Sequence, residues 1–287
     1  MAYEQVTGRI GAAVASCVLA IGSRALHAVA GTGLIVVQGG GWAEDSAVAF
    51  SSLTTGGSSQ QALLDLRRLE RPVAQYGVAT TSGELDAWTG TGATPWCGHD
   101  VRPAVAVHGN TLVDEGVVQA CHEAWTIANE QRLEERLLAS LAAGVAAGGD
   151  LRGQQSAALL SIGPAPDSPR HDLRVDDAPD PVGQLRALLP VLRAHELLQL
   201  AWGEVATDAQ GAASTMRRAV DLAPHDGLVA QTAALVFMQA GKADQAAERW
   251  RVALRNLPNP AARLSAWRHT LPWVASDVLD RLAALAD

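Results

Sequence analysis

The stretch GGDLRGQQSAALLS, residues 148–161, decides how the first part of this chain folds. It follows a long helical pattern, turns at two glycines and leads into an apolar run, residues 157–162, that predicts a buried strand. Asp150 and Arg152 are therefore expected at the mouth of a strand, where a rigid element fixes polar groups that a loop keeps accessible. The simpler interpretation of the same two residues is an ion pair that pins the turn.

Length and composition predict a folded protein of two domains. The chain has 287 residues, 48% of them hydrophobic, which is enough for a substantial core. Its net charge is −8, its pI is near 5.5, and its only lysine is Lys242. Because phosphate groups are bound by clustered Lys and Arg, this composition argues against nucleic-acid and membrane partners.

Cysteine usage and the N-terminal region bear on the compartment. Cys17, Cys97 and Cys121 are odd in number and lack Cys-x-x-Cys spacing, so neither a disulfide framework nor a zinc site is indicated. The apolar run at residues 10–21 imitates a secretory signal, but it is too short to span a bilayer as a helix, and Arg24 follows it closely. We therefore predict a cytoplasmic protein.

Hydrophobic periodicity predicts an α+β domain with sheets packed under helices. Period-two or continuous apolar patterns indicate strands at residues 10–15, 31–38, 75–79, 85–89, 101–107 and 157–162. Helical spacing is found at residues 60–69, 117–125 and 133–147. Ser82 and Gly83 predict a hairpin turn between the third and fourth strands. Strands and helices come in blocks, so the pattern favours layers over alternating βαβ units.

Two loops contain residues that can form ligand sites. The glycine triplet at residues 39–41 is not followed by Lys-Ser/Thr, so we expect a flexible bend and no phosphate loop. Residues 172–180 are acidic, but no His or Glu at helical spacing completes a metal shell around Asp176 and Asp177. We expect a solvated connection there, and the sequence predicts neither a metal nor an organic cofactor.

The C-terminal third contains a repeat of 34 residues within residues 193–260. The repeat aligns Ala212 with Ala246, Met216 with Trp250, Ala219 with Ala253, and Pro224 with Pro258. Its period is that of tetratricopeptide repeats, in which small residues let paired helices approach and prolines end the second helix of each pair. We therefore predict an all-α tetratricopeptide-like module.

The role of this module stays open at the level of sequence. Residues 261–286, with Trp267 and Trp273, predict a helical cap or an incomplete third repeat. The module is either a docking surface for a protein or peptide, or a stabilising or dimerising lid that would make the protein a homo-oligomer. Exposed tryptophans would favour docking.

Five separated motifs resemble a known family over residues 8 to about 190. They are GRIGAAVAS at residues 8–16, AGTGLIVVQ at 30–38, VHGN at 107–110, AGGDLRGQQSAAL at 147–159 and DLRVDDAPDP at 172–181. In this order they resemble the uncharacterised bacterial family known as domain of unknown function 1028.

The resemblance implies an α+β fold, the four-layer αββα sandwich of N-terminal-nucleophile (Ntn) hydrolases, for residues 1–190, with the helical module at 191–287. In that superfamily the first residue of the mature chain, a Thr, Ser or Cys, attacks an amide while its own α-amino group acts as the base. The candidate pocket residues, which match the family's motifs, are Ser16, Gln38, Asn110, Asp150 and Arg152. His108, His99 and Ser156 are expected to be structural, hydrogen-bonded residues.

The chain departs from the family pattern at the nucleophile. Family members begin with Thr or Ser and a full strand before the segment matching Thr7 and Gly8, whereas here only residues 1–6 precede it. Three explanations are open: a start further upstream, internal cleavage exposing Cys17, Ser23 or Thr32, or an inactive member. The functions predicted are accordingly an amidohydrolase or, alternatively, a catalytically inactive binding or scaffold protein.

Overall fold

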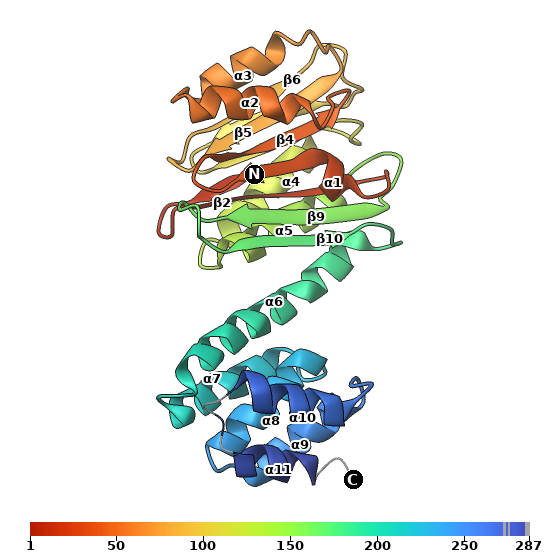
Figure 1. The fold of residues 1–287 in the computed structure, drawn as a ribbon. Coiled ribbons are helices and arrows are strands. Elements are labelled where there is room, and N and C mark those ends of the chain that lie inside the picture. The colour runs from red at the N-terminus through yellow and green to blue at the C-terminus, as the bar shows by residue number, and fades with distance from the viewer. Residues whose placement is uncertain (272–273, 275, 285–287) are drawn as a thin grey trace. The chain divides into compact units, whose positions relative to one another are not determined.

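The computed structural model describes residues 1–271, 274 and 276–284 and contains two units. The first unit is Met1–Arg186 and the second is Ala187–Asp287. The division falls inside the longest described helix, α6 (Pro181–Glu204) (Figure 1). The candidate pocket residues all belong to the first unit.

The first unit is built on two antiparallel sheets. The six-stranded sheet has the order β10-β9-β2-β1-β8-β7, and the four-stranded sheet has the order β3-β4-β5-β6. The strands of the first are β1 (Ala2–Glu4), β2 (Arg9–Ser16), β7 (Gly98–Arg102), β8 (Val105–Gly109), β9 (Ser156–Ile162) and β10 (Arg170–Val175). Those of the second are β3 (Leu26–Val29), β4 (Gly33–Gly39), β5 (Ala74–Thr80) and β6 (Leu85–Thr89).

Helices cover the outer faces of both sheets. The helices of this unit are α1 (Ile21–Ala25), α2 (Asp45–Thr54), α3 (Ser59–Arg67), α4 (Gly116–Ile127) and α5 (Leu133–Ala146). Figure 1 shows α2 and α3 on the four-stranded sheet, where Ala49 and Leu66 pack against Ile35 and Tyr76. Helices α4 and α5 contact β8 and β2 of the other sheet. The mixed α and β composition in blocks agrees with the sequence pattern.

The main core of the unit lies between the sheets. Ile10, Ala12 and Val14 of β2 alternate along the strand and share one face, because successive side chains of a strand point to opposite sides. They pack with Leu34 and Val36 of β4, and all of these side chains are buried. Residues 10–16 of the signal-like run are therefore an interior strand of the larger sheet.

One strand prediction was wrong, and a short strand was missed. Residues 101–107 do not form one strand: β7 and β8 make a hairpin in which Arg102 pairs with Val105, and Ala104 in its turn has φ 65°. Pro103 lies in this turn, as expected of a residue that cannot donate to a ladder. The Leu26–Val29 strand and the adjacent helix α1 were missed because both are too short to show a period.

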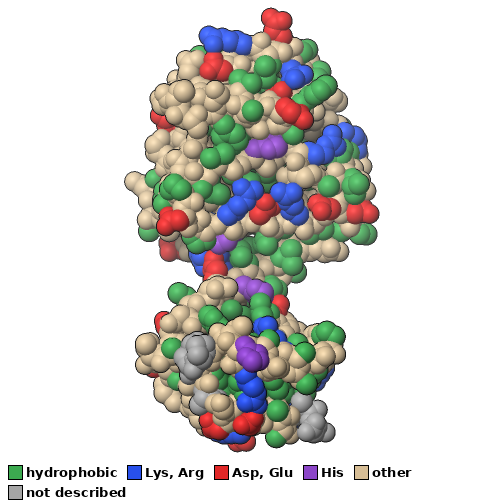
Figure 2. All heavy atoms as spheres, in the orientation of Figure 1, with side chains coloured by type: hydrophobic (Ala, Val, Ile, Leu, Met, Phe, Trp, Pro, Cys, Tyr) green, Lys and Arg blue, Asp and Glu red, His purple; other side chains and the backbone are tan. Residues whose placement is uncertain are grey.

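The acidic segment was also more regular than expected, since its first part is the edge strand β10. Arg170, Asp172 and Arg174 alternate on one face and form ion pairs with N···O distances of 3.0 Å and 2.7 Å. Charged side chains are common on edge strands because they discourage pairing with other chains. Figure 2 shows basic and acidic side chains next to each other on the face that it presents.

The polar region at residues 51–61 contains the end of helix α2 and the beginning of helix α3. Helix α2 reaches Thr54, and α3 begins after Ser58, whose hydroxyl oxygen accepts a hydrogen bond from Gln61 N at 3.2 Å. This hydrogen bond is an N-terminal cap, a role for which Ser is favoured. Helix α2 was missed because its apolar residues show only weak helical periodicity. The helix at residues 60–69 was found with nearly correct bounds.

The second unit consists of helices around its own core. After α6 come α7 (Ala209–Leu222), α8 (Gly227–Gln239), α9 (Ala243–Leu254), α10 (Pro260–Thr270) and α11 (Ser276–Ala283). The residues aligned at 34-residue spacing are fully buried in pairs: Ala212 and Ala246, Met216 and Trp250, Ala219 and Ala253. Pro224 lies two residues after the end of α7, and Pro258 lies four residues after the end of α9.

Trp250 and Trp267 of this unit lie in its core. Trp250 is fully buried and its ring centroid is 6.0 Å from that of Trp267, which is also buried. Trp273 lies outside the described residues. Because both side chains are buried, neither Trp250 nor Trp267 can form an exposed docking surface for a partner. Within the described part of the chain, no helix combines the length and apolarity needed to cross a bilayer.

Candidate functional site

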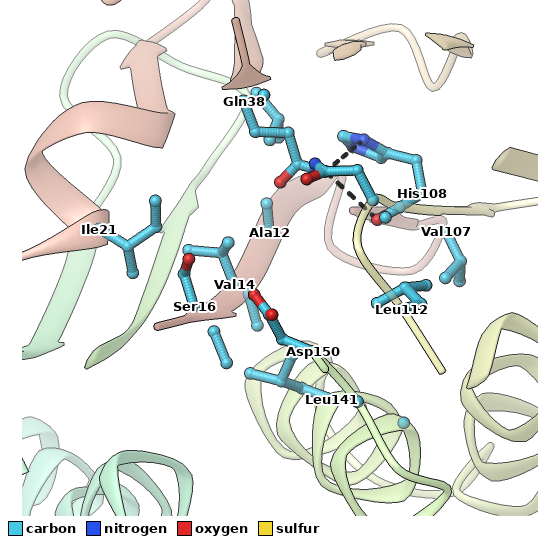
Figure 3. A pocket seen from close by; sticks show the side chains of 18 of the residues that line it. Ala12, Val14, Ser16, Ile21, Gln38, Val107, His108, Leu112, Leu141 and Asp150 are labelled. Carbon is cyan, nitrogen blue, oxygen red and sulfur yellow. Dashed lines mark hydrogen bonds between the residues drawn. The ribbon is translucent and has the colours of Figure 1, made fainter. Parts of the chain in front are cut away.

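A pocket of about 780 Å³ lies in the first unit, and all five candidate pocket residues line it. They come from four segments: Ser16 ends β2, Gln38 is on β4, Asn110 follows β8, and the loop between α5 and β9 carries Asp150 and Arg152. Figure 3 shows Gln38 beside His108 and Asp150 directed towards Ser16 and Val14. Residues about 130 positions apart in the chain therefore meet in one cavity.

Gln75 of β5 holds two of these side chains in place. Its Oε1 accepts hydrogen bonds from Gln38 Nε2 at 3.0 Å and from Asn110 Nδ2 at 2.9 Å. Its Nε2 donates to the Gly109 carbonyl at 2.7 Å and to Thr89 Oγ1 at 2.9 Å. Gln75 is fully buried, so this network orients the pocket amides from behind.

His108 is a neutral, hydrogen-bonded member of the same network. Gln38 Nε2 lies 3.1 Å from His108 Nδ1, and because an amide nitrogen can only donate, Nδ1 accepts and the ring proton is on Nε2. Burial lowers the pKa of His108 to about 3, helped by the nearby Met1 amino group and by His99. His108 is thus an acceptor for Gln38, which agrees with a structural role.

The Asp150–Arg152 turn has the geometry expected of a pinned loop. Gly148 and Gly149 have φ values of 116° and 55°, which residues with a Cβ rarely adopt, and they bring Asp150 to a bridge with Leu112. Asp150 Oδ1 accepts from the Arg152 backbone N–H at 2.9 Å, and Oδ2 lies 2.7 Å from Arg152 Nη2. The hydrogen bond with Asp150 raises the pKa of Arg152. The pair pins the turn and also lines the pocket.

The amino end of β1 opens into the same pocket. The Met1 amino group donates to the Ala106 carbonyl at 2.8 Å, and burial lowers its pKa to about 6. Ser156, by contrast, lies outside the pocket: its Oγ accepts from Ile21 N at 3.0 Å and donates to the Val18 carbonyl, which holds the start of α1. His99 Nδ1 lies 2.9 Å from Thr89 Oγ1 at the edge of the Gln75 network.

The family model described as "Family of unknown function (DUF1028)" matches residues 1–185. The chain belongs to the DUF1028 family. A crystal structure of protein SPO2555 from Silicibacter pomeroyi, itself titled with this family, is similar to the chain at 30% sequence identity and a TM-score of 0.60. The similarity covers 65% of this chain and 81% of that one. None of the curated proteins matches the chain.

Sequence reasoning missed Gln75, which orients two side chains of the DUF1028 pocket, and the Met1 amino group at the pocket. Gln75 carried a usable signal, because it is the one amide side chain in the otherwise mostly apolar strand segment AQYGVAT, and a buried amide needs partners. The buried Met1 amino group gave no signal, since its position depends on sheet pairing. Among the described residues, no group of three or more His, Cys, Asp or Glu side chains could hold a metal ion.

The lowered pKa of His108 predicts an acid-sensitive DUF1028 domain. In the unfolded chain a histidine titrates near 6.5, so between about pH 6.5 and pH 3 the unfolded state binds the extra proton. The contribution of His108 to stability is therefore lost as the pH falls through this window, by up to about 1.4 kcal/mol per pH unit.

Urea unfolding between pH 7 and pH 4 checks this expectation against the His108→Gln variant. Below pH 6.5 the variant should lose stability less steeply than the wild type, because glutamine does not titrate. Identical pH profiles for the two proteins would contradict it.

Proposed function

We propose that the protein is an amide hydrolase whose nucleophile is the first residue of its mature chain, and that the first unit is a four-layer αββα sandwich of the Ntn type. The observation that carries this proposal is that the amino end of β1 opens into the pocket lined by the candidate residues. In a hydrolase of this type, the hydroxyl or thiol and the α-amine that activates it belong to one residue at this place.

The electrostatics at this end of β1 favour a neutral amine. Desolvation penalises the ammonium form, and for Met1 it lowers the pKa to about 6. An amine with such a pKa is mostly unprotonated at pH 7 and can take a proton from a nucleophile. The same group can return that proton to the leaving amine when the amide bond breaks.

Asn110 is the residue that we expect to stabilise the oxyanion. Gln75 Oε1 accepts one hydrogen from Asn110 Nδ2, and Asn110 Oδ1 accepts from Thr111 Oγ1 at 3.1 Å, so the amide is held in one orientation. The second hydrogen of Nδ2 is available to a ligand in the pocket that Asn110 lines. A preoriented donor of this kind stabilises the negative charge on a tetrahedral intermediate.

Arg152, Asp150 and Gln38 are better placed to position a substrate than to take part in bond cleavage. Arg152 is half exposed and its Nε and Nη2 are both bonded to Asp150, so the pair shapes the pocket mouth. Gln38 uses its Nε2 group to donate hydrogen bonds to Gln75 and His108. Its side-chain oxygen can accept a hydrogen bond from the N–H of an amide substrate. The substrate class that fits is an amide or peptide-like compound.

Protein purified from its own host tests the proposal. We expect intact mass and terminal sequencing to give a mature chain that begins with Thr, Ser or Cys, and we expect turnover of a panel of N-acyl p-nitroanilides. Asn110→Ala should lower kcat by about 10²–10³-fold, whereas Asn129→Ala, at an exposed position, should not change it. A mature chain with another first residue and no turnover would refute the hydrolase.

For the second unit we propose three tetratricopeptide-like helix pairs that act as a stabilising lid or a dimer contact. The pairs would be α6 with α7, α8 with α9, and α10 with α11, with prolines after the second helix of the first two pairs. The buried positions at 34-residue spacing support this assignment, and the burial of Trp250 and Trp267 favours a structural role over docking. A protein or peptide partner, and a cytoplasmic location, stay predictions.

A further inference from the structure

Trp42 is an exposed tryptophan at the pocket described above. Its side chain is 62% exposed, and among the tryptophans of the described residues it is the only exposed one. It lines the cavity in the same chain segment as Gln38 and Glu44. Tryptophan is highly buried on average, because its large ring gains much from leaving water. An exposed indole beside a cavity is therefore available for contact with a ligand.

A tight turn keeps Trp42 close to the end of β4, which carries Gln38. The Gly41 N–H donates to the Gln38 carbonyl at 3.2 Å, so the chain reverses directly after this strand. The Gly40 N–H donates to the Val73 carbonyl at 3.0 Å, which ties the turn to the residue before β5. Trp42 is the next residue after the turn, so its backbone stays beside the pocket amide.

Close packing holds this turn in one conformation. Gly39 has φ 65°, and a Cβ at this position would lie 2.4 Å from the Val73 carbonyl oxygen. A Cβ on Gly40 would lie 2.0 Å from Val73 Cγ2. The sequence predicts a flexible bend here, but contacts as close as these leave the glycines little room to move. The turn therefore presents Trp42 at a defined place on the pocket.

Asp45 fixes the backbone and the ring of Trp42. Asp45 is buried, and its Oδ2 accepts hydrogen bonds from the Trp42 N–H at 3.0 Å and from the Tyr76 hydroxyl at 2.8 Å. Burial and the hydrogen bond with Asp45 raise the pKa of Tyr76, so its hydroxyl remains a donor. Asp45 Oδ2 also lies 2.8 Å from Arg71 Nε, and the guanidinium carbon of Arg71 is 4.9 Å from the Trp42 ring centroid. This network orients an indole whose surface is mostly exposed.

We propose that Trp42 binds an aromatic ring of the substrate, so that the substrate is an amide that carries an aryl group. The amide, which Gln38 would bind, rests on the proposed function, whereas binding of an aryl group at Trp42 does not depend on hydrolysis. Aromatic pairs in offset-stacked or edge-to-face geometry gain more than burial of their area alone provides. A ring that is already oriented loses little conformational entropy on binding.

A neutral ring fits this place better than a cationic group. The Arg71 guanidinium already contacts the indole, and it would repel a second cation bound to the same ring. Arg24 and Arg152 also line the pocket. We therefore assign the surface of Trp42 to a neutral aryl group.

Fluorine NMR of the full chain labelled with 5-fluorotryptophan tests whether the ring binds at Trp42. The Trp42 signal is the one that is absent from the Trp42→Phe variant. The ligand is 3-phenylpropanamide, which has a ring and a primary amide in one small molecule. We expect the Trp42 signal to shift more than the other tryptophan signals as the ligand is added. A Trp42 signal that does not move at saturating ligand would overturn the proposal.

Affinities measured by calorimetry test whether the contact is aromatic. The control ligand is 3-cyclohexylpropanamide, which has a similar size but no planar ring. Affinity for 3-phenylpropanamide should fall about tenfold in Trp42→Ala and less than about threefold in Trp42→Phe, which keeps an aromatic ring. Affinity for the cyclohexyl compound should fall less than about threefold in both variants.

Two outcomes of these titrations would overturn the aromatic assignment. Equal losses for the phenyl and cyclohexyl compounds in Trp42→Ala would reduce Trp42 to a general apolar contact. Unchanged affinity together with a lower Tm in Trp42→Ala would show that the indole only covers the ion pair of Arg71 and Asp45.

A pair of glycine variants tests whether the turn positions the indole. Gly39→Ala places a Cβ against the Val73 carbonyl, whereas Gly56→Ala places one at φ 88° with no atom within 4 Å. Both variants therefore have an alanine at positive φ, and only the first has a clash. We expect Gly39→Ala to lower the affinity for 3-phenylpropanamide at least about threefold and Gly56→Ala to leave it unchanged. Equal affinities in the two variants would overturn the positioning role of the turn.

Turnover separates this proposal from the proposed function. Release of ammonia from 3-phenylpropanamide, faster than from the cyclohexyl compound and slower in Trp42→Ala, supports both. Binding that depends on Trp42, without turnover of either compound or of the anilide panel, supports the aryl site and counts against the hydrolase. Turnover of the anilides with no effect of Trp42→Ala on binding supports the hydrolase and overturns the aryl site.

Discussion

Replacing Gln75 with leucine is expected to lower the free energy of unfolding of the first unit by about 3–5 kcal/mol. Gln75 is fully buried, and its amide makes hydrogen bonds to Gln38, Asn110, Thr89 and the Gly109 carbonyl. Leucine has a similar size but no hydrogen-bonding group, so several of these donors and acceptors lose a partner at once. An unsatisfied buried polar group costs about 1–3 kcal/mol.

Urea unfolding at pH 7 measures this loss, with Gln60→Leu on the exposed face of α3 as the matched control. The control should change stability by less than about 0.5 kcal/mol. The pocket should change too, since Gln38 and Asn110 lose the oxygen that orients them, and any amide turnover should fall together with stability. If Gln75→Leu unfolds at the same urea concentration as the wild type, the network does not hold the sheet together.

Replacing Glu134 with leucine is expected to lower the free energy of unfolding of the first unit by a similar amount, about 3–5 kcal/mol. The substitution leaves the Arg9 guanidinium without its carboxylate partner. Glu134 Oε1 lies 3.4 Å from Arg9 Nη2, 2.8 Å from His171 Nδ1 and 2.6 Å from Ser161 Oγ. Glu134 is almost fully buried and the Arg9 side chain is 12% exposed, so water compensates little for the lost carboxylate. This cluster joins α5 to β2, β9 and β10.

A double variant distinguishes an unpaired charge from lost packing. Arg9→Met with Glu134→Leu removes both charges and should recover much of the stability that Glu134→Leu loses. Glu123→Leu on the exposed side of α4 is the control for replacing a glutamate with leucine. A double variant as unstable as Glu134→Leu would assign the loss to packing, contrary to this account.

Local patterns in the sequence predicted several strands, helices and turns correctly. The apolar run at residues 10–15 predicted the strand β2, and helical spacing predicted α5 with an error of one residue at its end. The glycine pair before Asp150 predicted the turn and its ion pair with Arg152. These features depend on neighbours within a few positions, which a sequence displays directly.

Elements without a local period were missed or merged. Helix α1 has five residues and β3 has four, fewer than a periodic pattern needs. The Arg102–Val105 turn lies inside an apparently continuous strand, and only pairing between β7 and β8 separates the two. The charges of β10 suggested a loop because its ion pairs alternate along an exposed edge.

The sequence by itself determined the strands and helices that have a period, the family motifs, and which five residues to examine for a pocket. Only the tertiary structure decided that these residues meet in one pocket and that Gln75 orients two of them. The physical reason is that sheet register pairs residues such as Ser16 with Ser156, which are far apart in the chain. Such pairing follows from the packing of the whole domain, and no local pattern encodes it.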